Sequence, residues 1–203
     1  MEYFLAYLMI GLFAGLAAGL LGVGGGIVVV PALVYTFSFG DYFAGQVTYI
    51  AIATSLATMV FTTGSSVVAH HRKGAVLWSV VFRLAPGLVV GAVAGVVAVG
   101  QMSNQALGMV LGFFEIFIAL QILIKFKLAN RRSLPGVVNL SLIGGGIGSL
   151  SSLVGVGGGT LVVPFLMYCG VPLRSCVATS SACALAIAAT GVITFLLMSV
   201  TNS

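Results

Sequence analysis

Two nearly identical glycine-rich segments are the part of this sequence best suited to chemistry. The segment 20–35 reads LLGVGGGIVVVPALVY and returns at 153–168 as LVGVGGGTLVVPFLMY, with eleven of sixteen positions identical at an offset of 133. Glycine has no Cβ atom, so the backbone of three adjacent glycines can adopt positive φ angles and approach a ligand closely. Free backbone N–H groups at a helix start form a partly positive concave site that suits an oxyanion. The candidate binding residues are the two glycine triplets: Gly24, Gly25, Gly26, Gly157, Gly158 and Gly159.

A proline follows each triplet after five residues, at Pro31 and Pro164. We expect each proline near the start of the following half-helix, where a missing N–H is least disruptive. A second interpretation stays open, in which the glycines only allow close helix packing, as small residues do in membrane bundles. A dinucleotide-binding fingerprint is disfavoured, because it requires an acidic residue about 20 positions onward on a strand, whereas Asp41 falls between apolar segments.

An Ala-Thr-Ser step follows each glycine motif, and it places hydroxyl groups in the next apolar segment. These hydroxyls can donate to a sulfonate-like oxygen, or they can bond back to a backbone carbonyl one turn earlier without any role in binding. Both interpretations stay open. The four candidate residues are Thr54, Ser55, Thr179 and Ser180.

Two charged side chains, Arg83 and Glu115, fall inside apolar segments. Arg83 lies nine residues beyond Gly74 and Glu115 lies ten before Lys125, so both are roughly 14 to 15 Å from the same membrane face at 1.5 Å per residue. A buried unpaired charge costs several kcal/mol, which predicts an Arg83–Glu115 ion pair. In one interpretation Arg83 attracts an anion while Glu115 responds to protons; in the other the pair only fixes helix packing.

The composition indicates the environment in which these residues must be positioned. Hydrophobic residues make up 60% of the chain and charged residues 5%, against roughly 25% charged residues in soluble domains. The sequence therefore predicts an integral membrane protein. The net charge of +5 does not indicate nucleic-acid binding, because six of the eight basic residues form two clusters, 72–73 and 125–132, beside long apolar segments. This is the positive-inside pattern and places both clusters in the cytoplasm.

Hydropathy divides the chain into six apolar stretches, at about 3–38, 45–69, 75–99, 104–126, 134–170 and 175–200. A spanning helix needs roughly 20 residues, so the first and fifth stretches are too long for one straight helix, and a glycine motif interrupts each. Non-helical backbone in lipid is tolerable only where it faces protein or a watery cavity. We therefore expect an all-α transmembrane helical bundle of two repeats, each opening with a glycine-broken helix. Whether the broken segments cross once or fold back is open, as is whether the repeats are parallel or inverted. A single crossing places Arg174 on the external side.

The motifs carry a family resemblance. The pattern G-x-G-G-G-x-x-x-V-P at Gly22–Pro31 and again at Gly155–Pro164, each followed by an Ala-Thr-Ser step, together with the basic turn His71–Gly74, resembles the sulfite exporter TauE/SafE family. The resemblance covers nearly the whole chain. It implies about eight membrane segments from a duplicated four-segment unit, and movement of sulfite, sulfonates or related small anions across the inner membrane. On this basis residues 1–130 form repeat one with about four membrane segments, and residues 134–203 form repeat two without its last two helices.

We therefore expect an inner-membrane permease that moves a small, sulfur-containing anion such as sulfite or an organosulfonate by alternating access. The alternative is a non-transporting accessory subunit or truncated paralogue. The sequence offers no Ser/His/acid set and no metal-ligand cluster, which argues against an enzyme and predicts no cofactor. The expected partners are the small anion and the lipid bilayer, with no nucleic acid and with a homodimer as one possible assembly. The three cysteines lack C-x-x-C spacing, and we expect them to act as small apolar side chains.

Overall fold

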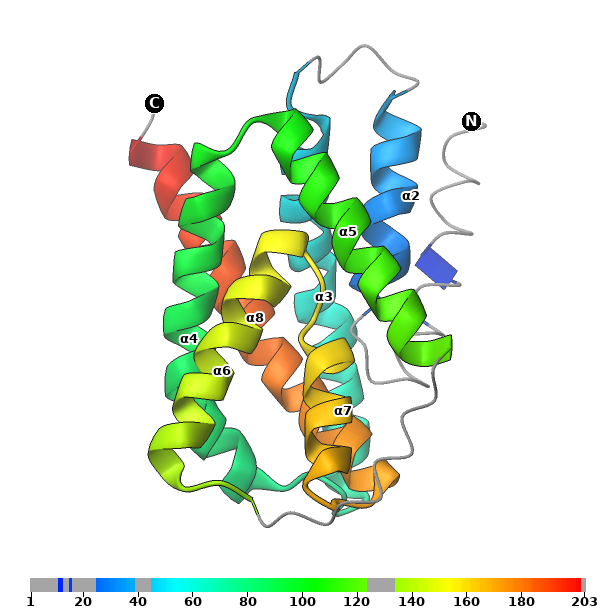
Figure 1. Ribbon diagram of the computed structural model, residues 1–203, viewed down its shortest axis with the longest axis vertical. Coiled ribbons are helices and arrows are strands. Elements are labelled where there is room, and N and C mark those ends of the chain that lie inside the picture. Colours follow the sequence, from blue (N-terminus) through cyan, green and yellow to red (C-terminus); the bar gives the residue numbers. More distant parts are fainter. Residues whose placement is uncertain (1–10, 13–14, 16–24, 39–44, 124–133, 202–203) are drawn as a thin grey trace.

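The computed structural model of the chain describes residues 11–12, 15, 25–38, 45–123 and 134–201. Its labelled elements are all helices and form one bundle, in which the long helices run roughly along a common axis (Figure 1). In chain order they are α2 (Gly26–Ser38), α3 (Val47–Arg72), α4 (Trp78–Gln101), α5 (Asn104–Leu123), α6 (Val137–Val154), α7 (Gly159–Tyr168) and α8 (Leu173–Thr201). The prediction of an all-α fold is confirmed.

The outer surface of the bundle is apolar. Five of the described helices, α3, α4, α5, α6 and α8, are long and apolar enough to cross a membrane. Large hydrophobic side chains on them stay exposed, including Phe61, Phe113 and Leu142 at 80%, 73% and 71%. Soluble monomers rarely expose such contiguous apolar surface, whereas lipid is a favourable neighbour for it. The chain is therefore an integral membrane protein, as predicted from its composition.

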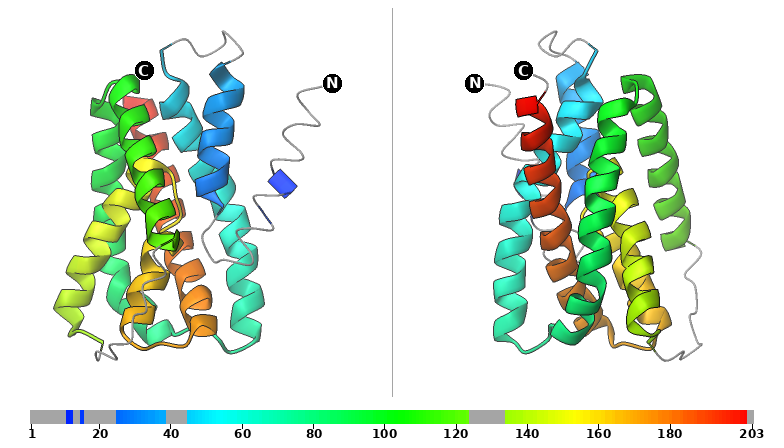
Figure 2. Two further views of the ribbon diagram at one scale, coloured as in Figure 1. Left: turned by 45° about the vertical axis from the view of Figure 1, so that its right-hand side comes forward. Right: turned by 90° about the vertical axis from the view of Figure 1, so that its left-hand side faces the viewer.

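The fifth apolar stretch breaks at its glycine motif and folds back. Helix α6 ends at Val154, and Gly155 follows with φ +72° before α7 begins at Gly159. Both views show α6 running from one end of the bundle to its middle and α7 returning to the same end (Figures 1 and 2). The predicted break is confirmed, and of the two alternatives that the sequence left open, the structure shows the fold-back.

The fold-back corrects the position of Arg174. The first two turns of α8 pack beside the turn between α3 and α4, where the Thr179 Oγ1 accepts a hydrogen bond of 3.1 Å from the backbone N–H of Leu77. Arg174, in the first turn of α8, therefore lies at the same end of the bundle as Arg72 and Lys73 (Figure 2). We call this the basic end. The external position that a single crossing gives Arg174 is wrong, because the hairpin of α6 and α7 starts and finishes on one side.

Helices that follow corresponding glycine motifs run in opposite directions. Helix α2 runs away from the basic end and α7 runs toward it, while α3 descends to the basic end and α8 rises from it (Figures 1 and 2). The two long helices α3 and α8 pack against each other. The helices that follow the two glycine motifs are therefore antiparallel to their counterparts.

Small residues bring α4 and α6 into close contact. Gly87 and Gly91 of α4 lie so near α6 that an added Cβ on either would overlap backbone carbonyl oxygens, those of Ser141 and Gly145 respectively. On the facing side, a Cβ on Gly144 would lie 2.6 Å from the carbonyl oxygen of Leu84. Side chains at these positions would therefore force the two helices apart, which is the small-residue packing common in membrane bundles.

This packing separates Arg83 from Glu115. Helix α4 packs on α6 and α8, whereas α5 packs on α3 and α6, so consecutive helices joined by a short turn are not neighbours. Arg83 is exposed on α4. Glu115 is half-buried on α5, and its buried Oε1 has no hydrogen-bond partner within the described chain. The predicted Arg83–Glu115 ion pair is wrong, because the glycine face of α4 selects α6 as its neighbour.

The cysteines behave as small apolar residues, as expected. Cys176 and Cys183 are buried and Cys169 is half-buried, and all three are free thiols. Cys176 and Cys183 belong to the apolar cluster near the basic end. They therefore contribute to packing within the described part of the chain.

Candidate functional site

The first glycine motif forms the start of α2. Gly25 has φ +79°, and its carbonyl oxygen accepts hydrogen bonds of 3.0 Å from the N–H groups of Val28 and Val29. Gly25 and Gly26 are buried. Gly24 lies outside the described residues. Because the helix begins at Gly26, Pro31 is its sixth residue and lies in its second turn, near the start of the helix.

The second motif forms the bend between α6 and α7. The Gly155 N–H bonds to the last carbonyls of α6, and the Val156 N–H donates to the Ser151 carbonyl at 2.8 Å. Gly158 has φ +43° and precedes α7, and its carbonyl accepts from the N–H groups of Leu161 and Val162. Positive φ angles at Gly155 and Gly158 are readily available only to glycine. All residues from 155 to 160 are buried.

The two motifs meet in the middle of the bundle. A Cβ on Gly26 would overlap the carbonyl oxygen of Gly155 and lie 2.8 Å from the Cα of Val156. Gly155 is itself close to α2 and α3, since a Cβ added to Gly155 would lie 3.1 Å from both the Val30 Cγ2 and the Ile52 Cα. The contact between Gly26 and Gly155 fits the packing interpretation of the glycines. It also brings the N-terminal end of α2 to the bend from which α7 starts.

Of the four predicted hydroxyl residues, Ser55 contacts the motifs directly. Its Oγ donates a hydrogen bond of 2.8 Å to the Gly155 carbonyl, and the side chain is fully buried. Thr54 is half-buried on α3. Thr179 bonds to the turn between α3 and α4, as described above, and the Ser180 Oγ donates to the carbonyl of Val177 at 2.8 Å. The predicted hydroxyl residues therefore do not form one site, because Ser55 contacts the second glycine motif whereas Thr179 lies near the basic end.

Replacing Ser55 by alanine should lower the free energy of unfolding by about 1 to 3 kcal/mol, because the Gly155 carbonyl loses a buried hydrogen bond. Thermal or denaturant unfolding of the purified protein in detergent measures the change. Ser38→Ala is the matched control, since Ser38 is exposed and its Oγ only bonds back to Val34 one turn earlier. Equal losses in both variants would contradict the assigned role of Ser55.

Two hydroxyl residues at the second motif were missed from the sequence. Ser151, in the last turn of α6, is fully buried, and Thr160, the second residue of α7, is 8% exposed. The Ser151 Oγ and the Thr160 Oγ1 have no hydrogen-bond partner in the described part of the chain. The one signal available was the hydroxyl group itself, and for Ser151 the neighbouring Ser149 and Ser152 carry the same group. Arg83, by contrast, was predicted to bind substrate but is exposed on α4.

Apolar clusters lie on both sides of the motifs. A cluster toward the basic end contains Leu84, Leu88, Ile147, Val162, Leu166 and Ile187 among others. A cluster toward the opposite end contains Val30, Ile52, Val99, Leu107, Val156 and Phe195 among others. We call them the basic-end cluster and the far-end cluster. Together they keep the motifs away from both ends of the bundle.

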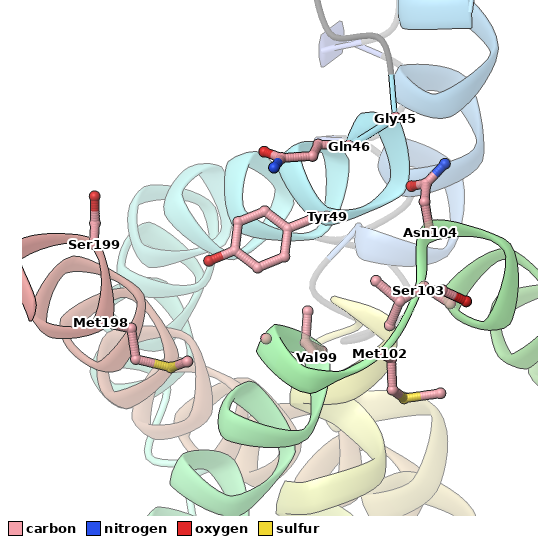
Figure 3. A pocket seen from close by; sticks show the side chains of 11 residues that line it. Gly45, Gln46, Tyr49, Val99, Met102, Ser103, Asn104, Met198 and Ser199 are labelled. Atoms are coloured by element: carbon pink, nitrogen blue, oxygen red, sulfur yellow. The ribbon is translucent and has the colours of Figure 1, made fainter. Parts of the chain in front are cut away.

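A cavity of about 650 Å³ opens at the end of the bundle away from the basic end. Its lining comes from the start of α3, the end of α4, the start of α5 and the end of α8, with Gln46, Tyr49 and Asn104 as polar members (Figure 3). The Asn104 Oδ1 accepts a hydrogen bond of 2.8 Å from the backbone N–H of Thr48. Val99 and Leu107 belong both to this lining and to the far-end cluster. The cavity therefore ends on the far-end cluster, and no described residue of either glycine motif contributes to its lining.

Comparison with known proteins identifies a family. The family described as sulfite exporter TauE/SafE matches residues 7–203. A "Probable membrane transporter protein" of Haemophilus influenzae is 30% identical over 96% of this chain and 74% of its own length. The "Probable membrane transporter protein YunE" of Bacillus subtilis is 28% identical over 87% of this chain and 72% of its own length. A similar protein of Xylella fastidiosa is 30% identical over 76% of this chain and 59% of its own length. No solved structure gives a significant match.

Proposed function

The chain belongs to the sulfite exporter TauE/SafE family of membrane transporters, and we propose that it is an inner-membrane permease for a small sulfur-containing anion, such as sulfite or an organosulfonate. The proposed mechanism is alternating access. The relatives named as membrane transporters support a transport function and give no sign of enzymatic activity.

The observation that carries the proposal is the contact between the two glycine motifs in the buried middle of the bundle, where the start of α2 meets the bend that leads into α7. Helix N-termini carry partial positive charge and unpaired N–H groups, and broken helices near the membrane midplane are typical substrate sites of transporters. Gly26 starts α2 and Gly159 starts α7. We propose that the glycine triplets, with Ser55 beside them, surround the anion. Thr54, Thr179, Ser180 and Arg83 stay predictions from the sequence.

Alternating access requires that the site opens to one side at a time, and the two apolar clusters are the proposed gates. The far-end cluster lies between the cavity at that end and the motifs, and the basic-end cluster packs on their other side. Both clusters are packed in this structure, and in the proposed cycle we assign this arrangement to the occluded state. Rocking of the antiparallel pairs α2–α3 and α7–α8 against each other would loosen one cluster while it compresses the other.

Transport assays on the purified chain in liposomes test the proposal. We expect time-dependent uptake of [35S]sulfite that saturates with concentration and that excess unlabelled sulfite or methanesulfonate reduces. Imposing a pH gradient of either sign reveals coupling to protons. Liposomes without protein and liposomes with the heat-denatured chain serve as controls. Absence of uptake above these controls for both sulfite and methanesulfonate would support the accessory-subunit alternative instead.

A further inference from the structure

The second glycine motif holds hydrogen-bond donors that the protein leaves unused. The Ser151 Oγ and the Thr160 Oγ1 are buried and unpartnered within the described chain. Buried polar groups nearly always have a hydrogen-bond partner, so each exception calls for an explanation such as a bound ligand. Ser152, next in sequence and equally buried, bonds back to the Ser149 carbonyl at 3.2 Å. The lack of a partner is therefore specific to these two hydroxyls and not general for this end of α6.

Both hydroxyls belong to the N-terminal end of α7. The Ser151 Oγ lies 3.7 Å from the position that a Cβ on Gly158 would occupy, so it points at the residue that precedes the helix. Side chains in a helix tilt toward its N-terminus, which directs Thr160 toward the same place. The backbone N–H of Thr160 has no recorded partner among the described residues, whereas those of Leu161 and Val162 bond to Gly158. Two hydroxyls and one backbone N–H at this helix start are thus without a partner among the described residues.

The first motif lacks an equivalent set. At the offset of 133, the counterparts of Ser151 and Thr160 are Ala18 and Ile27, neither of which carries a hydroxyl. In addition, the start of α2 is already in contact with the carbonyl oxygen of Gly155. That carbonyl oxygen already faces the positive end of α2, so the start of α7 is the better placed of the two helix starts to supply hydrogen bonds to an anion. The two motifs are therefore alike in sequence but differ in the hydrogen-bond donors that they present to a ligand.

We propose that the anion binds at the start of α7, with the Ser151 and Thr160 hydroxyls and the Thr160 N–H as its donors, and that the first motif serves to support this bend. This inference rests on the proposed function and narrows it. Three donors match the three oxygens of a sulfonate or of hydrogensulfite. No charged side chain lies among the residues of this site from 147 to 160, so it favours a single negative charge over a dianion such as sulfate.

The test measures [35S]sulfite binding to the full purified chain in detergent by scintillation proximity, with methanesulfonate, acetate and sulfate as competitors. Methanesulfonate should compete better than acetate or sulfate. Ser151→Ala and Thr160→Val should each raise the Kd about 10- to 100-fold, as expected for one hydrogen bond to a charged ligand. Thr160→Ser, which keeps the hydroxyl, should stay within about threefold of the wild type. The melting temperature without ligand should not fall in these variants, because no protein hydrogen bond is lost.

The matched controls replace hydroxyls that already have partners. Ser152→Ala removes a hydroxyl that donates to the Ser149 carbonyl, and Thr194→Val removes one that donates to the Thr190 carbonyl at 2.8 Å. Both variants should leave the Kd unchanged.

Wild-type affinity in Ser151→Ala and Thr160→Val would overturn the inference while leaving the proposed function intact. Weaker binding with a lowered melting temperature in the absence of ligand, not restored by Thr160→Ser, would assign the two residues a structural role and also overturn it. A wild-type chain that neither binds nor transports sulfite or methanesulfonate would overturn the proposed function itself.

Discussion

Replacing Gly91 by alanine should prevent stable assembly of the bundle, because the added methyl group would overlap the carbonyl oxygen of Gly145 and lie 2.9 Å from the backbone nitrogen of Ser149. Both atoms belong to the backbone of α6 and cannot move aside as a side chain can. We expect a loss on the order of 3 kcal/mol in the free energy of unfolding, measured as the unfolding midpoint in detergent and as the yield of monodisperse protein.

Gly146→Ala is the matched control on the partner helix. An added Cβ at Gly146 would meet no atom within 4 Å, and alanine favours a helix over glycine by up to about 1 kcal/mol. This variant should be as stable as the wild type or slightly more so. Similar losses in both variants would mean that the α4–α6 contact does not hold the bundle together as closely as the structure indicates.

The sequence predicted the membrane class and the break at the second glycine motif, since both depend on local properties, while the break predicted at the first motif lies outside the described residues. Composition alone requires lipid as the surrounding medium, and a stretch as long as 134–170 cannot span a bilayer as one straight helix. The fold-back at Gly155 could not be predicted, because a kinked crossing and a hairpin both leave the bend among protein neighbours. The return of α7 to the end from which α6 starts distinguishes them (Figure 1), and that direction is set by tertiary packing.

Helix adjacency explains the failure of the predicted Arg83–Glu115 pair. Depth in the membrane follows from residue counts and was available from the sequence, but the choice of neighbour was not. The glycines of α4, such as Gly87 and Gly91, fit those of α6, such as Gly144, and this fit outweighs the short connection between α4 and α5. Small residues spaced four apart predict that one face of a helix packs closely against another helix, but they do not indicate which helix that is.

The two Ala-Thr-Ser steps show how equal sequences acquire different surroundings. Each step lies near the start of its helix, but α3 begins at the end away from the basic end and α8 begins at the basic end (Figure 1). Ser55 therefore reaches Gly155, whereas Thr179 meets Leu77 in the turn before α4. The missed residues Ser151 and Thr160 stand out through their burial without a partner, which only the folded structure reveals.

Gly26→Ala should abolish transport, because its Cβ would push the start of α2 away from Gly155 and Val156. The contact involves backbone on both sides, so the bend that precedes α7 must move. We expect at least a tenfold loss of [35S]sulfite uptake at equal protein density in liposomes, with a stability loss of about 1 to 3 kcal/mol. Gly64→Ala on α3 is the control, since a Cβ there would meet Leu185 at an ordinary 4.0 Å. Wild-type uptake by Gly26→Ala would contradict a functional role for the contact between the motifs.

Combining Gly26→Ala with Ser55→Ala tests whether the two residues act on one element. Gly26 packs against the Gly155 carbonyl oxygen and Ser55 donates a hydrogen bond to it, so displacement of Gly155 by the first change removes the geometry that the second depends on. Contacting residues of this kind show coupling energies of about 0.5 to 3 kcal/mol. The double variant should therefore lose less stability than the two single losses added together. Strict additivity would mean that α2 and α3 hold the bend independently, and that movement of one need not be transmitted to the other through Gly155.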